Sequence, residues 1–318
     1  MAKRKLALWG AWHVHAEKYL SAAAEAGATV VGIWDEDPER RDKIAAKCSL
    51  PAFASEEELL ASDADGVIVC TATSDHLRVL TKLAEAGKDV FTEKVLAVSD
   101  EDAEKVAAAV KKSGVAFVIS FPYLYRSWMR TALAMVEEGK LGRITSVRFK
   151  NCHSGSSGGW LPAAFYSKEE CGGGAMIDLG AHGMYLIAAL LGTPDTYRST
   201  FVCACPEAQP DPAHPVEDNA VTVMTWKNGC IASNETGFVT AGFLKSLEIS
   251  GTGGTIVWND TAMTMIDPAS GKFVEIPRLP SQPTPLEQFI NRNILPGCGI
   301  DEAVRLTAMM TGAYAARG

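Results

Sequence analysis

The sequence lacks several features that mark common classes of protein. Its 30 lysines and arginines are scattered among 38 acidic residues, giving a net charge of −8, so nucleic acid and anionic membranes are poor candidate partners. Its eight cysteines include no Cys-x-x-Cys pair, which argues against a zinc site built on that motif. The chain has no internal repeat, and we expect no membrane-spanning segment because no apolar run approaches that length.

The cysteines predict free thiols. Cys70 ends the apolar run "GVIVC", where a small buried thiol is expected. Cys203 and Cys205 alternate along a probable strand with His214 beyond them, but a zinc site needs more ligands. We therefore expect no metal site and a cytoplasmic location, because the cytosol keeps thiols reduced.

The N-terminal segment "MAKRKLALWGAW" places basic residues before a short apolar run. Glu17 and Lys18 follow soon after, so a first β-strand is a better interpretation than a signal peptide.

The first 120 residues alternate short apolar strands with helices. The strands expected are "KLALWG", "TVVGIWD", "ADGVIVC", "KDVFTE" and "VAFVIS", and the helices expected are 13–26, 37–48, 74–87 and 99–114. Such alternation is typical of a parallel sheet covered by helices on both faces. Right-handed crossovers then make it a doubly wound α/β sheet. Residues 1–120 are therefore predicted to form a Rossmann domain that binds a dinucleotide.

Residues 121–318 show a different pattern. A helix near 126–138 and the strand "ITSVRFKNC" lead to the Gly/Ser-rich stretch "HSGSSGGW" and a helix in "ECGGGAMIDLGAHGMYLIAALLG". Strand-like runs separated by turn signals follow, then a Pro-rich segment, 277–296, and a final helix, 301–316. We predict an α+β domain for substrate binding and oligomerisation, with an open-faced, largely antiparallel or mixed sheet. The final helix could pack back on the first domain.

The segment "LWGAWHVHAEKYL" lies where the first strand turns into the first helix. A dinucleotide fingerprint would place glycine at positions 10, 12 and 15, whereas this chain has Gly10, Trp12 and His15. Gly10 keeps the tight turn, but Trp12 puts an indole where the backbone should approach the pyrophosphate. This motif alone leaves two interpretations open, a nucleotide loop with two glycines replaced or a strand that simply enters a helix.

Three features favour the nucleotide loop. Asp35 ends the second strand, where a carboxylate can accept both hydroxyls of the adenosine ribose, and it would repel a 2′-phosphate, so NAD is expected over NADP. Asp37 suits the helix cap better, and Arg40 and Arg41 read as solvated surface. The segments "CTATSDH" and "FTEK" also end strands of the sheet. The expected cofactor-binding residues are Gly10, Trp12, His13, Val14, Asp35, Thr71, Thr73, His76, Glu93 and Lys94.

At "TEK" and "GGGAMIDLGAHGMYLIAALLG" the chain resembles the Gfo/Idh/MocA oxidoreductases, and "EEGKLGRITSV" and "SLEISGTGGTI" extend the likeness over nearly the whole chain. The resemblance implies an NAD-dependent dehydrogenase acting on a secondary alcohol of a sugar, cyclitol or related polyol, and a homodimer or homotetramer. It implies a catalytic set of Lys94, Asp178 and His182, with Glu93 supporting the lysine or the cofactor pocket and His76 in the nicotinamide-side loop. Departures from the family pattern are Trp12, His15, Ala72, Val95 and Tyr185.

These residue types suit alcohol oxidation. His182 could take the hydroxyl proton near neutral pH, Asp178 could orient that imidazole, and Lys94 could stabilise alkoxide character. Aromatic and basic candidates for substrate binding, which could equally belong to the core, are Tyr123, Arg126, Trp160 and Tyr166.

Two further functions stay open at this point. One is transient use of tightly bound NAD for glycoside cleavage or sugar interconversion. The other is a non-catalytic, sugar-binding relative, because Trp12 fills the loop.

Overall fold

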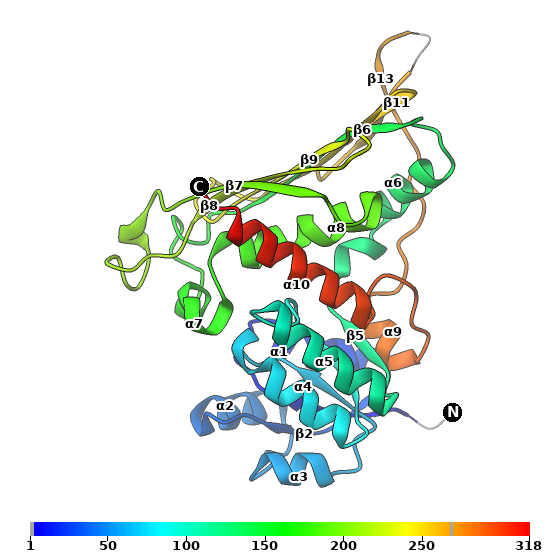
Figure 1. Cartoon of the computed structure of the whole chain (residues 1–318). Helices are drawn as coiled ribbons and strands as arrows, with labels where there is room; N and C mark the ends of the chain where they lie inside the picture. Colours follow the sequence, from blue (N-terminus) through cyan, green and yellow to red (C-terminus); the bar gives the residue numbers. More distant parts are fainter. Residues whose placement is uncertain (1–2, 268–269) are drawn as a thin grey trace. The chain divides into compact units, whose positions relative to one another are not determined.

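Two compact units make up the chain in its computed structural model, which describes residues 3–267 and 270–318 (Figure 1). Unit 1 contains the chain up to Pro122 together with Pro283–Thr307. Unit 2 contains Tyr123–Gln282 together with Ala308–Gly318.

Unit 1 is built on a five-stranded parallel sheet of order β2-β1-β3-β4-β5. Its order reverses direction beside β1, which is the point where open α/β sheets bind ligands. Every residue of β3 is buried, as expected for a strand covered on both faces. The predicted Rossmann sheet is therefore confirmed. Its strands are β1 (Lys5–Trp9), β2 (Thr29–Trp34), β3 (Gly66–Val69), β4 (Asp89–Thr92) and β5 (Phe117–Ile119).

The helices of unit 1 begin at sequence-encoded caps. Asp37 accepts hydrogen bonds from the backbone N–H groups of Glu39 and Arg40 at the start of α2, as predicted, and Ser99 caps α5. The first helix begins later than expected because residues 13–15 precede it as loop and cap. These helices are α1 (Ala16–Glu25), α2 (Pro38–Cys48), α3 (Glu56–Ala61), α4 (His76–Glu85) and α5 (Asp100–Ser113), with a 3-10 turn at Thr73–Asp75.

The Pro-rich segment contains a helix that was not expected from the sequence, α9 (Pro285–Asn291). A capping box between Thr284 and Glu287, with Pro285 in the first turn, starts it. Phe289 is fully buried, with its ring centroid 5.9 Å from that of Phe91. This burial explains why the segment belongs to unit 1. The last helix, α10 (Ile300–Ala315), follows.

Unit 2 is built on an eight-stranded sheet of order β13-β12-β11-β10-β6-β9-β8-β7. Only β6 and β9 pair in parallel among the strands described, so the largely antiparallel or mixed sheet is confirmed. The strands are β6 (Ile144–Cys152), β7 (Thr196–Val202), β8 (Asn219–Thr225), β9 (Ile231–Gly237), β10 (Leu244–Gly251), β11 (Gly254–Trp258), β12 (Met263–Ile266) and β13 (Phe273–Glu275).

Helices pack against this sheet within unit 2 (Figure 1). Trp128 stacks on Trp258 of β11, with ring centroids 3.9 Å apart. At Gly183 any side chain would collide with Asn234 of β9, so glycine is needed for this close approach. The helices are α6 (Ser127–Glu137), α7 (Lys168–Cys171), a π-helical turn η4 (Met176–Gly180) and α8 (Ala181–Leu191), with 3-10 turns at Pro122–Tyr125, Ala163–Tyr166 and Pro206–Ala208.

Two expectations need correction. The segment Lys168–Leu191 is long and apolar enough to cross a membrane by composition, because its most apolar 18-residue window has a mean hydropathy of 1.4, but 67% of that window is buried inside the structure. Burial of this kind is usual for a core helix. Cys203 and Cys205 lie beyond the end of β7 rather than along a strand. Asp218 organises this loop by accepting hydrogen bonds from the backbone N–H groups of Ala204 and Cys205.

Candidate active site

Gly10 makes the turn that ends β1. Its φ of +82° lies in the left-handed region, and its N–H donates to the carbonyl of Trp34 at 2.7 Å. A Cβ at this position would lie 2.6 Å from Thr71 Cγ2 and 2.9 Å from the backbone nitrogen of Thr71. Only glycine suits both the conformation and this close approach. Gly10 therefore has the tight-turn role that the sequence predicted.

The residues after Gly10 lead into the ten-residue helix α1. The backbone N–H of His13 donates to the carbonyl of Cys70 at 3.0 Å, and the His13 side chain is buried. Trp12 is half-buried and Val14 is 52% exposed. His15 occupies the cap of α1 and turns its imidazole toward Glu93, with Nδ1 2.8 Å from Oε1.

Asp35 lies directly after β2, as predicted, but its carboxylate already has several donors. It accepts hydrogen bonds from the backbone N–H groups of Ala11 at 2.6 Å and Asp37 at 2.9 Å. Arg40 donates to both carboxylate oxygens, from Nε at 2.8 Å and from Nη2 at 2.6 Å. Arg40 is thus the ion-pair partner of a carboxylate that is only 1% exposed, which corrects its interpretation as solvated surface.

Thr71, Thr73 and His76 follow β3 and are all buried. His76 Nδ1 donates to the carbonyl oxygens of Val95 at 2.9 Å and Leu96 at 3.2 Å. Burial lowers the pKa of His76. Among the described residues, His76 Nε2 and Thr71 Oγ1 are buried side-chain atoms with no hydrogen-bond partner. His76 therefore supports the segment that carries Lys94.

Glu93 and Lys94 follow β4 and are 2% and 8% exposed. The Lys94 backbone N–H donates to Glu93 Oε2 at 3.1 Å. The Lys94–Val95 peptide bond is cis, and Val95 stands where the family resemblance implies proline. Burial alone would raise the pKa of Glu93, but His13, His15 and Lys94 together hold it well below its ordinary value. Glu93 is therefore an ionised, buried carboxylate beside the lysine.

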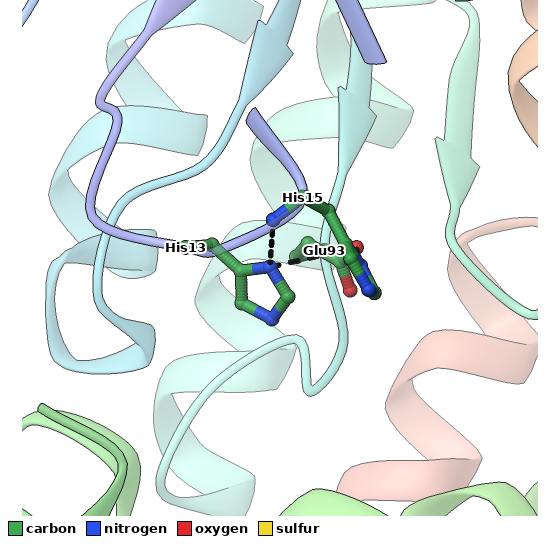
Figure 2. A group of neighbouring side chains, drawn as sticks. All are labelled: His13, His15 and Glu93. Atoms are coloured by element: carbon green, nitrogen blue, oxygen red, sulfur yellow. Dashed lines mark hydrogen bonds and ion pairs between the residues drawn. The ribbon is translucent and has the colours of Figure 1, made fainter. Parts of the chain in front are cut away.

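Figure 2 shows His13, His15 and Glu93 gathered at one place. His13 Nδ1 lies 3.9 Å from Glu93 Oε1 and accepts a hydrogen bond from the His15 backbone N–H at 3.2 Å. The Tyr19 hydroxyl also donates to Glu93 Oε1 and lies 2.9 Å from Ser120 Oγ. The sequence pattern assigned His13 and Glu93 to the cofactor but did not connect them with His15 or Tyr19.

In unit 2, Asp178 and His182 are the half-buried residues of an otherwise buried segment. Every other residue from 173 to 188 is buried. Asp178 lies in the π-helical turn η4, and His182 lies in the first turn of α8. π-Helical turns inside helices occur frequently at functional sites. The predicted helix is thus confirmed, with a widened turn at Asp178.

His182 is held by aromatic neighbours of unit 2. Its Nδ1 lies 2.9 Å from the Tyr185 hydroxyl, and that hydroxyl accepts a hydrogen bond from the Tyr123 backbone N–H at 3.2 Å. The Tyr123 ring centroid lies 4.6 Å from that of His182. Lys245 Nζ lies 5.3 Å from the Tyr123 ring centroid. The structure thus groups the expected Tyr123 with His182 and adds Tyr185 and Lys245.

A second aromatic group contains the expected Trp160 and Tyr166. His153 stacks on Phe238, with ring centroids 5.2 Å apart, and lies 4.7 Å from Trp160. Tyr166 packs edge-on to Phe238 and hydrogen-bonds through its hydroxyl to Ser156 Oγ at 2.8 Å. Burial lowers the pKa of His153 while the carboxylate of Asp178 opposes that shift, so Asp178 lies close to this group.

Trp160 is 48% exposed, which leaves much of its indole available to a ligand. Arg126, the remaining expected substrate residue, is exposed immediately before α6. Lys245 was missed because it lies in β10, far along the chain from the motifs. Tyr185 was named from the sequence only as a departure from the family pattern, although a hydroxyl three residues after His182 lies on the same helix face.

The residues of unit 1 fit a dinucleotide. Gly10 turns the chain tightly against Thr71, the buried Thr71 Oγ1 lacks a partner among the described residues, and the cap residue of α1, His15, makes no side-chain capping hydrogen bond. These features suit an anionic, hydrogen-bonding ligand at the carboxyl ends of the strands.

Comparisons with known proteins agree with both units. Residues 5–121 match the profile of the oxidoreductase family with an NAD-binding Rossmann fold, and residues 129–257 match the GFO/IDH/MocA C-terminal domain. Levoglucosan dehydrogenase of Pseudarthrobacter phenanthrenivorans is 26% identical over 249 residues, which cover 71% of this chain and 64% of that protein, less than two thirds of its length. Inositol 2-dehydrogenase of Rhizobium meliloti is 23% identical over 262 residues, which cover 81% of this chain and 75% of that protein.

Solved structures show the same fold. Levoglucosan dehydrogenase in complex with NADH and levoglucosan superposes with a TM-score of 0.85 at 19% identity, covering 99% of this chain and 97% of that one. GenD2 from gentamicin A biosynthesis, in complex with NAD, gives a TM-score of 0.79 at 21% identity, covering 99% of this chain and 94% of that one. The profile matches and the shared architecture lead to one conclusion: this chain belongs to the Gfo/Idh/MocA oxidoreductases, a family with an NAD-binding Rossmann domain.

Proposed function

We propose that the chain catalyses the NAD-dependent oxidation of a secondary alcohol in a sugar, cyclitol or related polyol, or the reverse reduction. The observation that carries this proposal is the exposure pattern of unit 2. Asp178 and His182 are half-buried on a segment whose other residues from 173 to 188 are fully buried. A core helix with two accessible groups able to exchange protons suits a substrate-binding surface better than a purely structural role.

Lys94 is the proposed catalytic residue of unit 1. It follows a strand at the carboxyl edge of the Rossmann sheet, where ligands bind. Its backbone N–H bonds to the ionised Glu93, and His76 bonds the carbonyls of the next two residues. Its ammonium is therefore presented from a well-defined segment. It would donate a hydrogen bond to the substrate oxygen and stabilise alkoxide character.

His182 is the proposed base. The Tyr185 hydroxyl at Nδ1 fixes the orientation of the ring, which directs Nε2 to the hydroxyl proton of the substrate. Tyr185 is thus a positioning residue. Asp178, one turn before His182, would stabilise the imidazolium or accept a hydrogen bond from another substrate hydroxyl. When bound, the nicotinamide of NAD supplies the hydride acceptor.

We also propose a preference for NAD over NADP. The Asp35 carboxylate lies where the adenosine ribose is expected, and a carboxylate disfavours a 2′-phosphate. Arg40 offsets part of that charge, so the preference should be moderate.

The exposed face of Trp160, within its aromatic group, suits the apolar C–H surface of a carbohydrate. The relatives named for levoglucosan and inositol act on such compounds. We further propose that the protein works in the cytoplasm, where its eight free thiols would stay reduced.

The proposal is tested in two steps. Calorimetric titration with NAD+ and NADH should detect binding of at least one at millimolar concentration. Purified protein is then assayed for NADH formation with inositols, levoglucosan and other cyclic polyols. Lys94→Met and His182→Ala should each lower kcat/KM by about a hundredfold or more. Lys112→Met, on the surface of α5, and His214→Ala, in an exposed loop, are matched controls.

Failure to bind either dinucleotide would contradict the proposal. Full activity of both Lys94→Met and His182→Ala would contradict the assigned roles. Absorbance near 340 nm that stays with the protein after gel filtration, without net NADH formation, would contradict net oxidation. It would instead favour a reaction in which tightly bound NAD is reduced and reoxidised within each turnover.

A further inference from the structure

The cluster of His13, His15 and Glu93 in unit 1 has a geometry that the proposed dehydrogenase chemistry does not require. One potential ligand atom from each residue lies within 4.8 Å of the other two. The three residues come from two places in the fold, the segment between β1 and α1 and the end of β4. We propose that these three side chains form a binding site for a divalent transition-metal ion such as Zn²⁺.

The donor set suits this class of ion. Two imidazoles and one carboxylate are typical ligands of Zn²⁺ and related borderline metals, and three protein ligands leave positions for water. Bonds of about 2.0–2.2 Å at tetrahedral angles separate ligand atoms by about 3.3 Å. The observed separations from Glu93 Oε1 are 2.8 Å to His15 Nδ1 and 3.9 Å to His13 Nδ1. Shifts of these side chains, with loss of the hydrogen bond that His13 Nδ1 accepts from the His15 backbone N–H, bring all three ligands into range.

The surrounding residues fix the positions of the proposed metal ligands. Glu93 is 2% and His13 is 6% exposed, so two of the three ligands are fixed by packing. The Tyr19 hydroxyl donates to Glu93 Oε1, the same oxygen that faces the two imidazoles, and lies beside Ser120 Oγ, so it helps to fix the position of that oxygen. Partners of this kind around the ligands commonly fix metal sites.

The third ligand provides access from solvent. The His15 side chain is 44% exposed and its neighbour Val14 is 52% exposed. A hydrated ion can therefore meet His15 first and exchange its waters for the buried pair. Figure 2 shows the His13 imidazole turned toward Glu93, with the hydrogen bond from the His15 backbone N–H that an ion would displace.

The test uses the purified full chain without dinucleotide, so its result does not depend on the proposed dehydrogenase function. After treatment with a chelator and its removal, calorimetric titration with Zn²⁺ should reveal a site that His15→Ala weakens at least about tenfold. Glu93→Gln should act in the same direction. Mg²⁺, which prefers oxygen ligands, should not fill the site.

His214→Ala is the matched control. His214 Nδ1 also lies 3.0 Å from a carboxylate oxygen of Asp211, but His214 is exposed, and the group of three ligands found among the described residues is His13, His15 and Glu93. Circular dichroism establishes that each variant is folded. The eight cysteines can bind Zn²⁺ weakly, so the difference between variants is the readout. Crystals soaked in Zn²⁺ should show anomalous density among His13, His15 and Glu93. Unchanged Zn²⁺ affinity in His15→Ala, or anomalous density only elsewhere, would overturn the proposal.

Discussion

At the residue scale, two buried carboxylates organise the loops of unit 1. Asp35 and Glu93 are 1% and 2% exposed, and each follows a strand of the parallel sheet. A buried carboxylate is costly unless hydrogen bonds and opposite charge compensate it. Asp35 obtains these from Arg40 and two backbone N–H groups, and Glu93 obtains them from His15, Tyr19 and the Lys94 backbone. These carboxylates therefore fix the segments from which cofactor and substrate contacts are expected.

Gly10→Ala should damage both stability and dinucleotide binding. The new Cβ would meet Thr71 at 2.6 Å in a backbone conformation that disfavours alanine. We expect a loss of about 1–3 kcal/mol in the free energy of unfolding, measured in urea, and weaker NAD binding by calorimetry.

Gly27→Ala is the matched control for that variant. Gly27 has a similar φ of +85°, but nothing lies within 4 Å of the point that a Cβ would occupy there. It should lose stability through backbone strain alone and keep its NAD affinity. Equal NAD affinity in the folded Gly10→Ala protein would contradict a nucleotide role for this turn.

Asp35→Asn should shift cofactor choice toward NADP. The substitution removes the charge that holds Arg40 and leaves its guanidinium free to meet a 2′-phosphate. We expect the ratio of NADP to NAD affinity to rise about tenfold, the scale of one charge-assisted hydrogen bond. Arg40→Ala, which removes the cation, should change the ratio in the opposite direction. An unchanged ratio in both variants would show that the ribose binds elsewhere.

At the element scale, the proposed cofactor-binding and catalytic residues of unit 1 lie in the segments that follow its strands. The helix α4 supports the segment after β4, which contains Lys94. His76, the first residue of α4, is 1% exposed and donates from Nδ1 to the carbonyls of Val95 and Leu96. Protonating its buried Nε2 would place a charge where no acceptor lies among the described residues. The lysine segment is thus tied to a neutral histidine.

This arrangement predicts acid sensitivity. Burial lowers the pKa of His76 in the folded chain, so as pH falls below about 6.5 the unfolded chain binds a proton that the folded chain does not. Stability from this group is therefore full above the unfolded pKa and declines as pH falls toward the folded pKa. The slope contributed is at most about 1.4 kcal/mol per pH unit.

Urea denaturation between about pH 5 and pH 7 measures this slope. His76→Gln should reduce it, whereas His214→Gln, at an exposed histidine, should not. His153, whose pKa burial also lowers, contributes equally in both variants. The same slope in His76→Gln and the parent would contradict the assignment.

At the scale of the whole molecule, local signals predicted most of the fold. Asp37 and Ser99 mark their helices, and the strand "ITSVRFKNC" coincides with β6 because its apolar residues alternate. The helix α9 was missed although Thr284 and Glu287 spell a capping box, because prolines around it suggested a loop. A helix or strand can therefore be predicted where a short stretch of sequence contains its cap or its alternation of apolar residues.

Contacts between distant residues were not predictable in this way. Glu93 and His15 are 78 residues apart, and their hydrogen bond depends on how side chains cross the sheet between β1 and β4. Lys245 of β10 lies over the ring of Tyr123, a residue far away in the chain. Arg40 was misassigned because its guanidinium turns back to Asp35 from the first turn of α2. Sequence patterns name candidate residues, but side-chain direction decides their partners.

The sheet of unit 2 also leads to a proposal about assembly. The face formed by Arg148, Val221, Val223, Ile231, Ser233 and Glu235 contains half-buried and exposed residues, while the alternate residues of β8 are buried. Cross-strand pairing places Val223 opposite Ser233, and Ser233 beside Arg148. A face that mixes valines with charges of both signs can pair with its own copy about a two-fold axis, because each charge can meet an opposite one.

We therefore expect the protein to sediment as a homodimer or homotetramer. Val223→Asp would place a carboxylate within that face and should produce a folded monomer in analytical ultracentrifugation. Val274→Asp is the matched control, since Val274 is 45% exposed in β13 at the far edge of the same sheet. This variant also replaces a strand valine by aspartate, but the residue lies outside the face that contains Val221 and Val223. Its oligomeric state should therefore equal that of the parent. A parent that sediments as a monomer at every concentration, or dissociation caused equally by both variants, would remove this face as the site of assembly.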